Sequence, residues 1–567
     1  MMKTVLRRSA VQILLGLVVA LTLFLPGLLF NMFAENPLTW FEGKYLWMFW
    51  AFGIVLCACP SFRLSATVLT GLAVLELTQF ASLAFTHEYI TPFAIGLMLI
   101  EYLDVAESTV ANSVHFLHVP LVVLLPYLLC LEILRRTWTF SFKSRWFVIF
   151  VIAFLAFPLV RIKTHTDRDG LVKFFPTATN PTLINTLNSY SLYFGVLLPE
   201  SLFGGTVRAE FPEYEIRETD IPPSPLTIVL VMGESLTPNH MSLYGYGRKT
   251  TPFLEELAGD PGFVHRKGYS AASATRAALP MFYTLQYHPL DENRLRRQDS
   301  NLFRLAKQHG FRTWYLSAQN SNCLNGVDLD PIDVMITAET RPELFEREKD
   351  EGLLQLVREV PSGGKNFIVV HQRNVHLPYQ ANIEHRPAFQ RFPTEELPFE
   401  DSTINAYDNA VLYADYLYQQ LLQELRQKTD GPLYVFFTSD HGEKLGENGH
   451  WGHDRLDLVS SVVPIMFYAR GGDGRYLREM REHPPATHYQ LGKMIARMLG
   501  YDIRNPAEEN GIVYVNGVAS LGRSGYMRFR VTDNGERRDL RVIQSPFVTV
   551  AGNKPGQETG TNQSIPR

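Results

Sequence analysis

Long apolar runs fill the first part of the chain, and shorter apolar runs alternate with polar, helix-like stretches after it. An apolar stretch of about 20 residues is long enough for a helix that crosses a bilayer. The long runs therefore predict an α-helical transmembrane domain of five spans over residues 1–162. The predicted spans are 10–31, 45–61, 64–85, 117–134 and 146–162.

Basic residues between these spans predict an orientation, because cytoplasmic loops carry an excess of Lys and Arg. Of the loops that would lie opposite the N-terminus, 32–44 and 86–116, only the first has a basic residue, Lys44. An odd number of spans then places everything after about residue 163 outside the cytoplasm, with the N-terminus inside. The basic residues on the N-terminal side are Lys3, Arg7, Arg8, Arg63, Arg135, Arg136, Lys143 and Arg145.

Acidic residues beside and within the predicted spans call for an explanation. Residues 91–100 are too few to span a bilayer and predict a re-entrant or surface helix. Glu101, Asp104 and Glu107 follow closely. They form either a solvated acidic face or a patch that recognises a cationic headgroup. Glu76, in the middle of a span, is costly in lipid and is expected to face the bundle interior.

A connector, residues 163–225, follows the predicted spans. Within it, residues 180–199 have apolar positions at helical spacing with Asn and Ser between them, as in an amphipathic helix that lies on a bilayer surface. The sequence PPSP at 222–225 marks the start of the next domain. At the other end of the chain, residues 551–567 are polar and rich in Gly and Pro, which predicts a disordered tail.

From residue 226 onward, the alternation of short apolar runs and helical stretches predicts a doubly wound α/β sheet in one exported domain, 226–550. We expect helices at 300–309, 351–359, 404–428 and 487–499. The predicted strands are 226–233, 312–318, 366–372, 433–439 and 464–469.

Composition adds one constraint to this picture. The chain has 567 residues, of which 46% are hydrophobic, and only four are cysteines. Cys57, Cys59 and Cys130 fall in predicted spans, which leaves Cys323 alone in the exported domain. Because a lone thiol cannot form an internal disulfide, the domain must be held by its core, with or without a bound metal.

Metal-binding side chains follow two of the predicted strands directly. Glu234 comes after the strand at 226–233, and Asp440 and His441 come after the strand at 433–439. Ligands of open α/β sheets lie beyond the carboxyl ends of the strands. Two carboxylates and an imidazole there make three Zn²⁺ ligands with a fourth position open, as in catalytic sites. The alternative is that Asp440 and His441 only cap a helix and bond to backbone.

Thr275, among small residues just before an apolar run, could fill the fourth position. A zinc-bound hydroxyl loses its proton near neutral pH and becomes a nucleophile. The alternative is an N-cap or turn residue that opens the following helix.

Three blocks carry a resemblance to a known family: GES…MSLYGYGRKTTP (233–252), SATRAALP (273–280) and SDHGEKLGENG…H (439–453). They resemble the phosphoethanolamine transferases of Gram-negative envelopes, which belong to the alkaline phosphatase/sulfatase superfamily. The resemblance implies an alkaline-phosphatase-like catalytic domain. It also implies Thr275 as the nucleophile. The implied zinc ligands are Glu234, Thr275, Asp440 and His441.

The resemblance also implies residues that contact the substrate. His376 and His453 would hold the substrate phosphate or a second zinc, and Glu107 would meet the ethanolamine amine. His450 and Asn320 are further candidates for substrate binding. The expected cofactor is one catalytic Zn²⁺, with a second left open.

The implied reaction moves phosphoethanolamine from phosphatidylethanolamine to an envelope acceptor through a threonine intermediate. The acceptor would be lipopolysaccharide core or lipid A, a periplasmic glucan or another glycan. Lipid A-modifying members typically have cysteines flanking the nucleophile segment, where this chain has Met281, and this favours the other acceptors. The protein would lie in the bacterial inner membrane with a periplasmic catalytic domain and no nucleic-acid partner.

Three other functions fit the sequence less well. A sulfatase would need a Cys/Ser-x-Pro-x-Arg motif, which SATRA (273–277) does not provide. A phosphoglycerol transferase that uses phosphatidylglycerol would share fold and topology, but its donor has no amine for the acidic residues 101–107 to meet. A membrane-anchored sensor with a degenerate domain would lack metal ligands, whereas all four are present.

Overall fold

The computed structural model describes nine stretches of the chain, and these divide into two compact units. The first unit comprises Met1–Thr206 with Asn448–Trp451, and the second comprises Val207–Glu447 and Gly452–Arg567. The domain boundaries expected at residues 162 and 225 stay predictions, and the expected tail at 551–567 lies outside the described residues. The described stretches are 2–33, 43–111, 115–141, 143–164, 174–177, 180–199, 210–453, 456–532 and 537–543.

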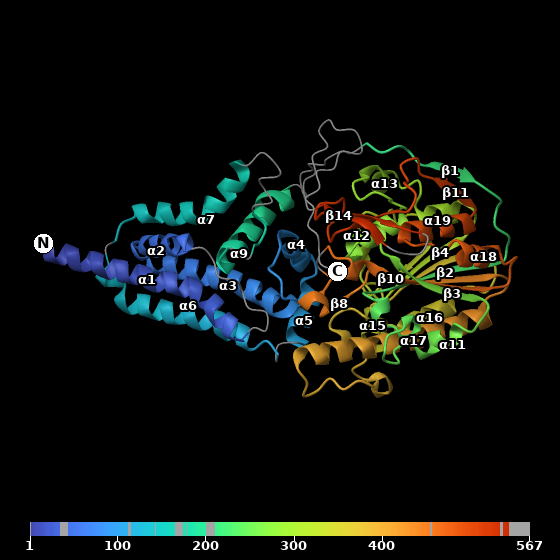
Figure 1. The fold of residues 1–567 in the computed structure, drawn as a ribbon, viewed down its shortest axis with the longest axis horizontal. Coiled ribbons are helices and arrows are strands. Elements are labelled where there is room, and N and C mark those ends of the chain that lie inside the picture. Colours follow the sequence, from blue (N-terminus) through green and yellow to red (C-terminus); the bar gives the residue numbers. More distant parts are fainter. Residues whose placement is uncertain are drawn as a thin grey trace. The chain divides into compact units, whose positions relative to one another are not determined.

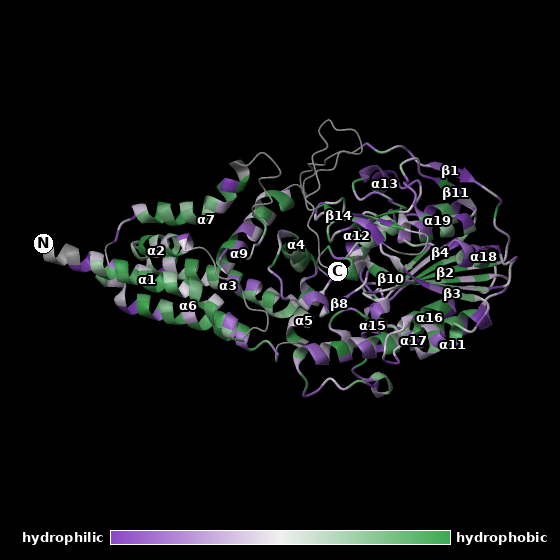
Figure 2. Ribbon diagram, viewed as in Figure 1, coloured by the Kyte–Doolittle hydropathy of each residue, from purple (hydrophilic) through white to green (hydrophobic). Residues whose placement is uncertain are grey.

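The first unit is helical, and Figure 2 shows hydrophobic residues along most of its helices. Long apolar runs form helices here because every backbone polar group is then bonded within its own segment. Its helices are α1 (Met2–Phe33), α2 (Lys44–Cys57), α3 (Phe62–Thr86), α4 (Pro92–Ile100), α5 (Tyr102–Ala111), α6 (His118–Thr137), α7 (Trp146–Thr164) and α9 (Thr182–Leu192).

Among the described residues, three helical stretches are long and apolar enough to cross a membrane: Arg7–Phe33, Phe62–Thr86 and His118–Phe140. The other two predicted spans form shorter apolar helices, Lys44–Cys57 and Trp146–Ile162. All five apolar segments are therefore helical, whereas the number of crossings and their orientation stay predictions.

Polar residues inside this unit are buried against one another. Glu76 of α3 is fully buried and accepts a hydrogen bond of 2.8 Å from the hydroxyl of Tyr127 on α6. This confirms that Glu76 faces the bundle interior. Helix α9, expected to lie on a bilayer surface, packs on α3 and α7 and buries Asn185 and Thr186. Its polar face is therefore covered by protein within the first unit.

The second unit is built on a seven-stranded sheet that contains all five predicted strands. β2 pairs in parallel with β6 and β7, whereas β10 runs antiparallel to β7 and β3. The α/β class is confirmed, with one antiparallel strand within the sheet. In order across the sheet, the strands are β3 (Phe263–Tyr269), β10 (Val462–Arg470), β7 (Leu433–Ser439), β2 (Leu226–Gly233), β6 (Lys365–His371), β4 (Arg312–Ser317) and β5 (Val334–Ile336).

Helices cover both faces of this sheet. Figure 1 shows α12 (Thr275–Tyr283) and α19 (His488–Met498) on one face, with α16 (Glu351–Glu359) and α17 (Phe399–Lys428) on the other. β2 is buried along its whole length, as expected of a strand covered on both faces. The same unit also contains helix α18 (Arg475–Glu482) and a small sheet of β12 (Ile512–Asn516), β13 (Tyr526–Val531) and β14 (Arg537–Ile543).

The register of the central strands brings their carboxyl ends level. Gly233 of β2 lies opposite Ser439 of β7, and Met232 lies opposite His371 of β6. His371 in turn lies opposite Ser317 of β4. Residues that directly follow these four strands therefore gather at one edge of the sheet, where α/β proteins place their ligands.

Candidate active site

Hydrogen bonds connect the ends of β2 and β7 at this edge of the sheet. After β2 the chain turns at Ser235, which has a left-handed φ of 53°. Such a conformation costs a non-glycine residue on the order of 1–3 kcal/mol and persists where its surroundings hold it. The Asp440 carboxylate accepts a hydrogen bond of 3.1 Å from the Ser235 N–H, and the Ser439 hydroxyl accepts one of 2.8 Å from the Leu236 N–H. The turn thus fixes Glu234 beside Asp440.

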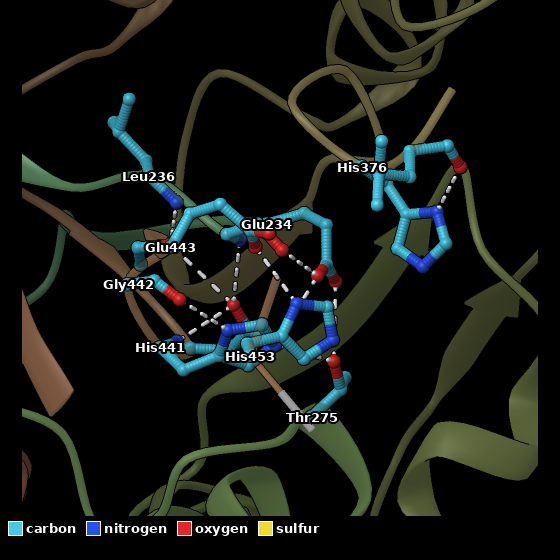
Figure 3. Close-up of polar contacts among 12 residues, drawn as sticks. Glu234, Leu236, Thr275, His376, His441, Gly442, Glu443 and His453 are labelled. Carbon is cyan, nitrogen blue, oxygen red and sulfur yellow. Dashed lines mark hydrogen bonds and ion pairs between the residues drawn. The ribbon is translucent and has the colours of Figure 1, made fainter. Parts of the chain in front are cut away.

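Glu234, Asp440 and His441 form a fully buried cluster at the strand ends. The Nε2 atom of His441 lies 3.4 Å from a carboxylate oxygen of Glu234 and 3.4 Å from one of Asp440. The other ring nitrogen, Nδ1, lies 2.9 Å from the Gly442 carbonyl, so we assign the Nδ1 hydrogen to that bond. This assignment leaves a lone pair on Nε2, the ring nitrogen that faces Glu234 and Asp440. Figure 3 shows His441 beside Glu234 and Thr275.

Thr275 brings a hydroxyl to the same point. Its Oγ1 lies 3.3 Å from Glu234 Oε2 and 3.2 Å from His441 Nε2. Thr275 is the first residue of α12, and the N-cap position belongs to Ala274. The hydroxyl therefore points into the cluster and does not act as the N-cap of the helix, which was the alternative considered for it. Its side chain is only partly buried, which leaves it open to a substrate.

Burial and charge act in opposite directions on this cluster. Burial opposes ionisation of Glu234, but the nearby His441, His376 and His453 hold its pKa well below the usual range. Burial, together with the charge of Glu234, raises the pKa of Asp440 to about 7. Burial also opposes protonation of His441, yet the carboxylates beside it raise its pKa overall. Two adjacent buried carboxylates therefore call for a compensating positive charge.

The donor set fits a divalent metal ion. The ligand atoms of Glu234, Asp440 and His441 all lie within 4.8 Å of one another. Asp440 Oδ2 is buried and has no hydrogen-bond partner among the described residues, which is costly unless a cation meets it. Two carboxylates and an imidazole, with a hydroxyl beside them, suit Zn²⁺.

A second group of metal-binding side chains adjoins the first and shares His441 with it. It consists of His441, Glu443 and His453, with the His441 and His453 ring centres 4.1 Å apart. Glu443 is fully buried; it accepts a hydrogen bond of 3.0 Å from the Tyr379 hydroxyl and lies 2.7 Å from His453 Nδ1. Glu443 therefore orients the His453 ring, a role that the sequence analysis did not assign to it.

The other predicted substrate residues lie in different surroundings. Figure 3 shows His376 set apart from Thr275 and His441. The Nδ1 atom of His376 is hydrogen-bonded to the Leu377 carbonyl, and its ring centre lies 6.4 Å from that of His453. Glu107 lies exposed on α5 of the first unit, and His450 lies in the Asn448–Trp451 segment that groups with that unit. Their assignment to substrate binding stays a prediction.

Gln319 is a site residue that the sequence analysis missed. Its amide nitrogen donates a hydrogen bond of 2.7 Å to Glu234 Oε2 and lies 3.1 Å from His371 Nε2. Burial lowers the pKa of His371 to about 4, so this ring is neutral. The predicted residue, Asn320, is the next along the chain and has an exposed side chain. A role for Asn320 in substrate binding stays a prediction, whereas Gln319 contacts the cluster.

Comparison with known proteins agrees with the fold of the second unit. Residues 226–501 match the family model described as Sulfatase. An integral membrane protein, lipooligosaccharide phosphoethanolamine transferase A (EptA) from Neisseria meningitidis, has a similar structure with a TM-score of 0.55. It is 18% identical, and the likeness covers 87% of this chain and 95% of that one. At this identity the likeness shows a shared fold, and it extends over the helical part.

Curated relatives match by sequence over part of their length. The chain is 25% identical over 313 residues to Kdo(2)-lipid A phosphoethanolamine 7''-transferase of Escherichia coli (strain K12), which is 48% of this chain and 51% of that protein. It is 30% identical over 240 residues to phosphoethanolamine transferase EptC of Escherichia coli O18:K1:H7 (strain RS218 / NMEC), 39% of this chain and 40% of that protein. The chain thus matches about half or less of these relatives. Residues 226–501 thus match the Sulfatase family model, and the chain is similar over part of its length to proteins named phosphoethanolamine transferases.

Proposed function

We propose that this protein transfers phosphoethanolamine from phosphatidylethanolamine to a glycan or lipopolysaccharide acceptor of the bacterial envelope, through a covalent intermediate on Thr275. The observation that carries the proposal is the position of the Thr275 hydroxyl, within 3.3 Å of both a buried carboxylate and the Nε2 atom of a buried histidine. The names of the curated relatives support the transferred group.

Glu234, Asp440 and His441, with the Thr275 hydroxyl, would hold a zinc ion. When bound, zinc would supply positive charge that lowers the pKa of the threonine hydroxyl and neutralises charge developing on the phosphoryl oxygens. The remaining chemistry falls to the side chains of this chain.

In the first step, Thr275 Oγ1 attacks the phosphorus of the donor lipid. An O–P bond forms to Thr275 as the bond to the diacylglycerol oxygen breaks, and the threonine proton passes to Glu234 Oε2, which already accepts its hydrogen bond. The departing oxygen takes up a proton, and we assign His453 as its donor, because Glu443 fixes the His453 ring through Nδ1.

In the second step, an acceptor hydroxyl or phosphate attacks the same phosphorus as the O–P bond to Thr275 breaks. The released Thr275 oxygen takes back its proton from Glu234. A histidine now accepts a proton from the acceptor, the reverse of its first role. His376 and His453 are the residues we assign to holding the phosphoryl oxygens. Thr275 sits at the N-terminus of α12, where backbone N–H groups favour negative charge.

We infer that the helical unit crosses the inner membrane five times, places the catalytic unit in the periplasm and gives it access to the donor lipid. Three helices of spanning length and two shorter apolar ones support this proposal. Glu107 is our candidate for contact with the ethanolamine amine.

A headgroup-transfer assay tests the proposed function. Phosphatidylethanolamine labelled in its headgroup is supplied to the full-length protein in detergent, with rough lipopolysaccharide as acceptor. We expect label on the acceptor with the wild type, little with Thr275→Ser and none with Thr275→Ala, while thermal unfolding stays similar. Transfer that persists in Thr275→Ala would remove the nucleophile, and transfer only from labelled phosphatidylglycerol would favour phosphoglycerol transfer.

A further inference from the structure

A cavity of about 750 Å³ lies in the second unit, outside the metal-binding clusters. Strand β3 lines one part of it, β10, α18, β13 and β14 contribute further residues, and the segments that hold Asn239, Val459 and Pro484 complete it. Cavities of this size accommodate a ligand as large as a disaccharide. None of the residues assigned so far to zinc or to the transferred group lines it.

Positive charge distinguishes this cavity from an ordinary surface hollow. Four of its lining residues are Arg or Lys, namely Arg266, Lys267, Arg481 and Arg537, and its described lining has no Asp or Glu. They come from β3, α18 and β14, so three separate parts of the fold direct cations to one place. A cavity with charge of a single sign attracts ligands of the opposite sign.

The present partners of these cations are neutral. Arg266 donates a hydrogen bond of 2.8 Å to the Pro484 carbonyl, and Lys267 one of 3.3 Å to the side-chain oxygen of Asn239. Arg481 donates to the Pro261 carbonyl. No carboxylate within the described stretches of the chain forms an ion pair with these three residues. An anionic ligand would therefore supply the missing countercharge through charge-assisted hydrogen bonds.

The rest of the lining suits a sugar that carries the anionic group. Val264, Val462, Met480 and Val531 add apolar surface, and Tyr269 adds an aromatic ring. Sugar rings present C–H groups on their faces and hydroxyls at their edges, so they pack on such residues while a phosphate meets the cations.

Two chain connections join this cavity to the candidate active site. Tyr269 is six residues before Thr275, a stretch that spans at most about 20 Å even when fully extended. Val459, which also lines the cavity, precedes Ser460, whose carbonyl accepts a hydrogen bond of 2.7 Å from the N–H of Gly442. Gly442 directly follows His441. A molecule about the length of an oligosaccharide could reach from one site to the other.

We propose that this cavity binds the phosphate-bearing saccharide part of the acceptor and thereby presents its reacting group to Thr275. The proposal rests on the transferase function proposed above and adds the place in the fold where the phosphorylated sugar of the acceptor binds. Arg266, Lys267 and Arg481 recognise the phosphate, and Tyr269 packs on the sugar.

Direct binding tests the site without any need for turnover. A bis-phosphorylated glucosamine disaccharide and its unphosphorylated counterpart are titrated calorimetrically into the full-length protein in detergent. The double variant combines Lys267→Gln with Arg481→Gln, and the triple variant adds Arg266→Gln. Arg312→Gln is the control for a lost positive charge, because Arg312 is the first residue of β4 and does not line the cavity. We expect the phosphorylated sugar to bind roughly tenfold more weakly for each cation lost, with no change in Arg312→Gln.

Turnover then separates this proposal from the proposed function. We expect the double variant to raise KM for rough lipopolysaccharide but not for the same material after phosphatase treatment, with the donor adduct on Thr275 unchanged. Unchanged binding of the phosphorylated sugar, or an equal loss for both sugars, would overturn the cavity proposal. A wild type that binds the sugar but forms no donor adduct would instead overturn the proposed function alone.

Discussion

The Thr275 hydroxyl lies 3.2 Å from Nε2 of His441, although 166 residues separate the two in the chain. Neither residue reaches this point by local structure alone. His441 is brought there by the end of β7, and Thr275 by the start of α12. The contact between Thr275 and His441 depends on nearby residues that hold the site in place. Substitutions can test these residues one at a time.

Gln319 holds Glu234 in the orientation that faces Thr275. Gln319→Ala removes a hydrogen bond to an ionised carboxylate, which is worth about 1.5–3 kcal/mol, so we expect the transfer rate to fall roughly tenfold or more. Gln319→Glu should be worse, because it places a third carboxylate beside Glu234. Steady-state transfer kinetics measure both. Asn320→Ala, at the exposed neighbouring position, is the comparison, and an equal loss there would contradict the role given to Gln319.

Asp440 should be required for zinc binding. Asp440→Asn removes the carboxylate whose Oδ2 atom is buried without a hydrogen-bond partner among the described residues. We expect its zinc content, measured by elemental mass spectrometry after purification, to be well below that of the wild type. Asp350→Asn is the matched control, because Asp350 is also buried but accepts hydrogen bonds from the Arg373 and Asn374 N–H groups. Equal zinc in Asp440→Asn and the wild type would argue against Asp440 as a ligand.

Gly442 lets the chain pass close to a neighbouring loop just after His441. A Cβ atom at Gly442 would lie 2.5 Å from the Val462 carbonyl oxygen and 3.0 Å from that of Val459. Gly442→Ala should therefore shift the backbone beside His441 and cost about 1–3 kcal/mol of stability, together with activity. Gly247→Ala is the control, since nothing lies within 4 Å of its added Cβ. Thermal unfolding of both variants measures the difference, and similar melting temperatures would show that the loop yields easily.

The buried carboxyl group of Asp415, which lies outside the candidate active site, should make the stability of the protein depend on pH. It accepts hydrogen bonds from the Phe253 and Leu254 N–H groups, and burial raises its pKa to about 7. An unfolded Asp has a pKa of about 4. Between these values the folded protein holds the proton more tightly than the unfolded chain does, so the wild type loses stability as pH rises from about 4 to about 7.

Asp415→Asn has no proton to lose at this position. The unfolding free energy of the wild type minus that of the variant should therefore decrease from about pH 4 to about pH 7 and level off above it. Chemical denaturation at a series of pH values measures this difference. A difference that stays constant, or that grows with pH, would contradict the raised pKa.

Much of the fold could be predicted from apolar runs, but not the direction of every strand. Residues 464–469 of β10 form an apolar run, and such a run gives no sign of whether its strand is parallel or antiparallel to its neighbours. β3, with the sequence FVHRKGY, was missed because its central residues are polar, as an edge strand permits. Neighbouring strands decide both features, and a single sequence does not show them.

The candidate site could be predicted where its residues directly follow apolar strands. Glu234, Asp440 and His441 stand at such positions, and the structure brings them together with Thr275. Gln319 and Glu443 gave no such signal, because Gln and Glu are common on surfaces. Gln319 matters because β4 lies beside β6, and Glu443 matters because Tyr379 and His453 meet around it. Contacts of this kind depend on tertiary structure.

The most direct test of the account is intact-protein mass spectrometry of the full-length protein after incubation with phosphatidylethanolamine and no acceptor. We predict a mass increase of one phosphoethanolamine, mapped by peptide fragmentation to Thr275, absent in Thr275→Ala and lost again when an acceptor is added. An adduct on another residue, or acceptor modification without any adduct under rapid quenching, would contradict the covalent threonine mechanism.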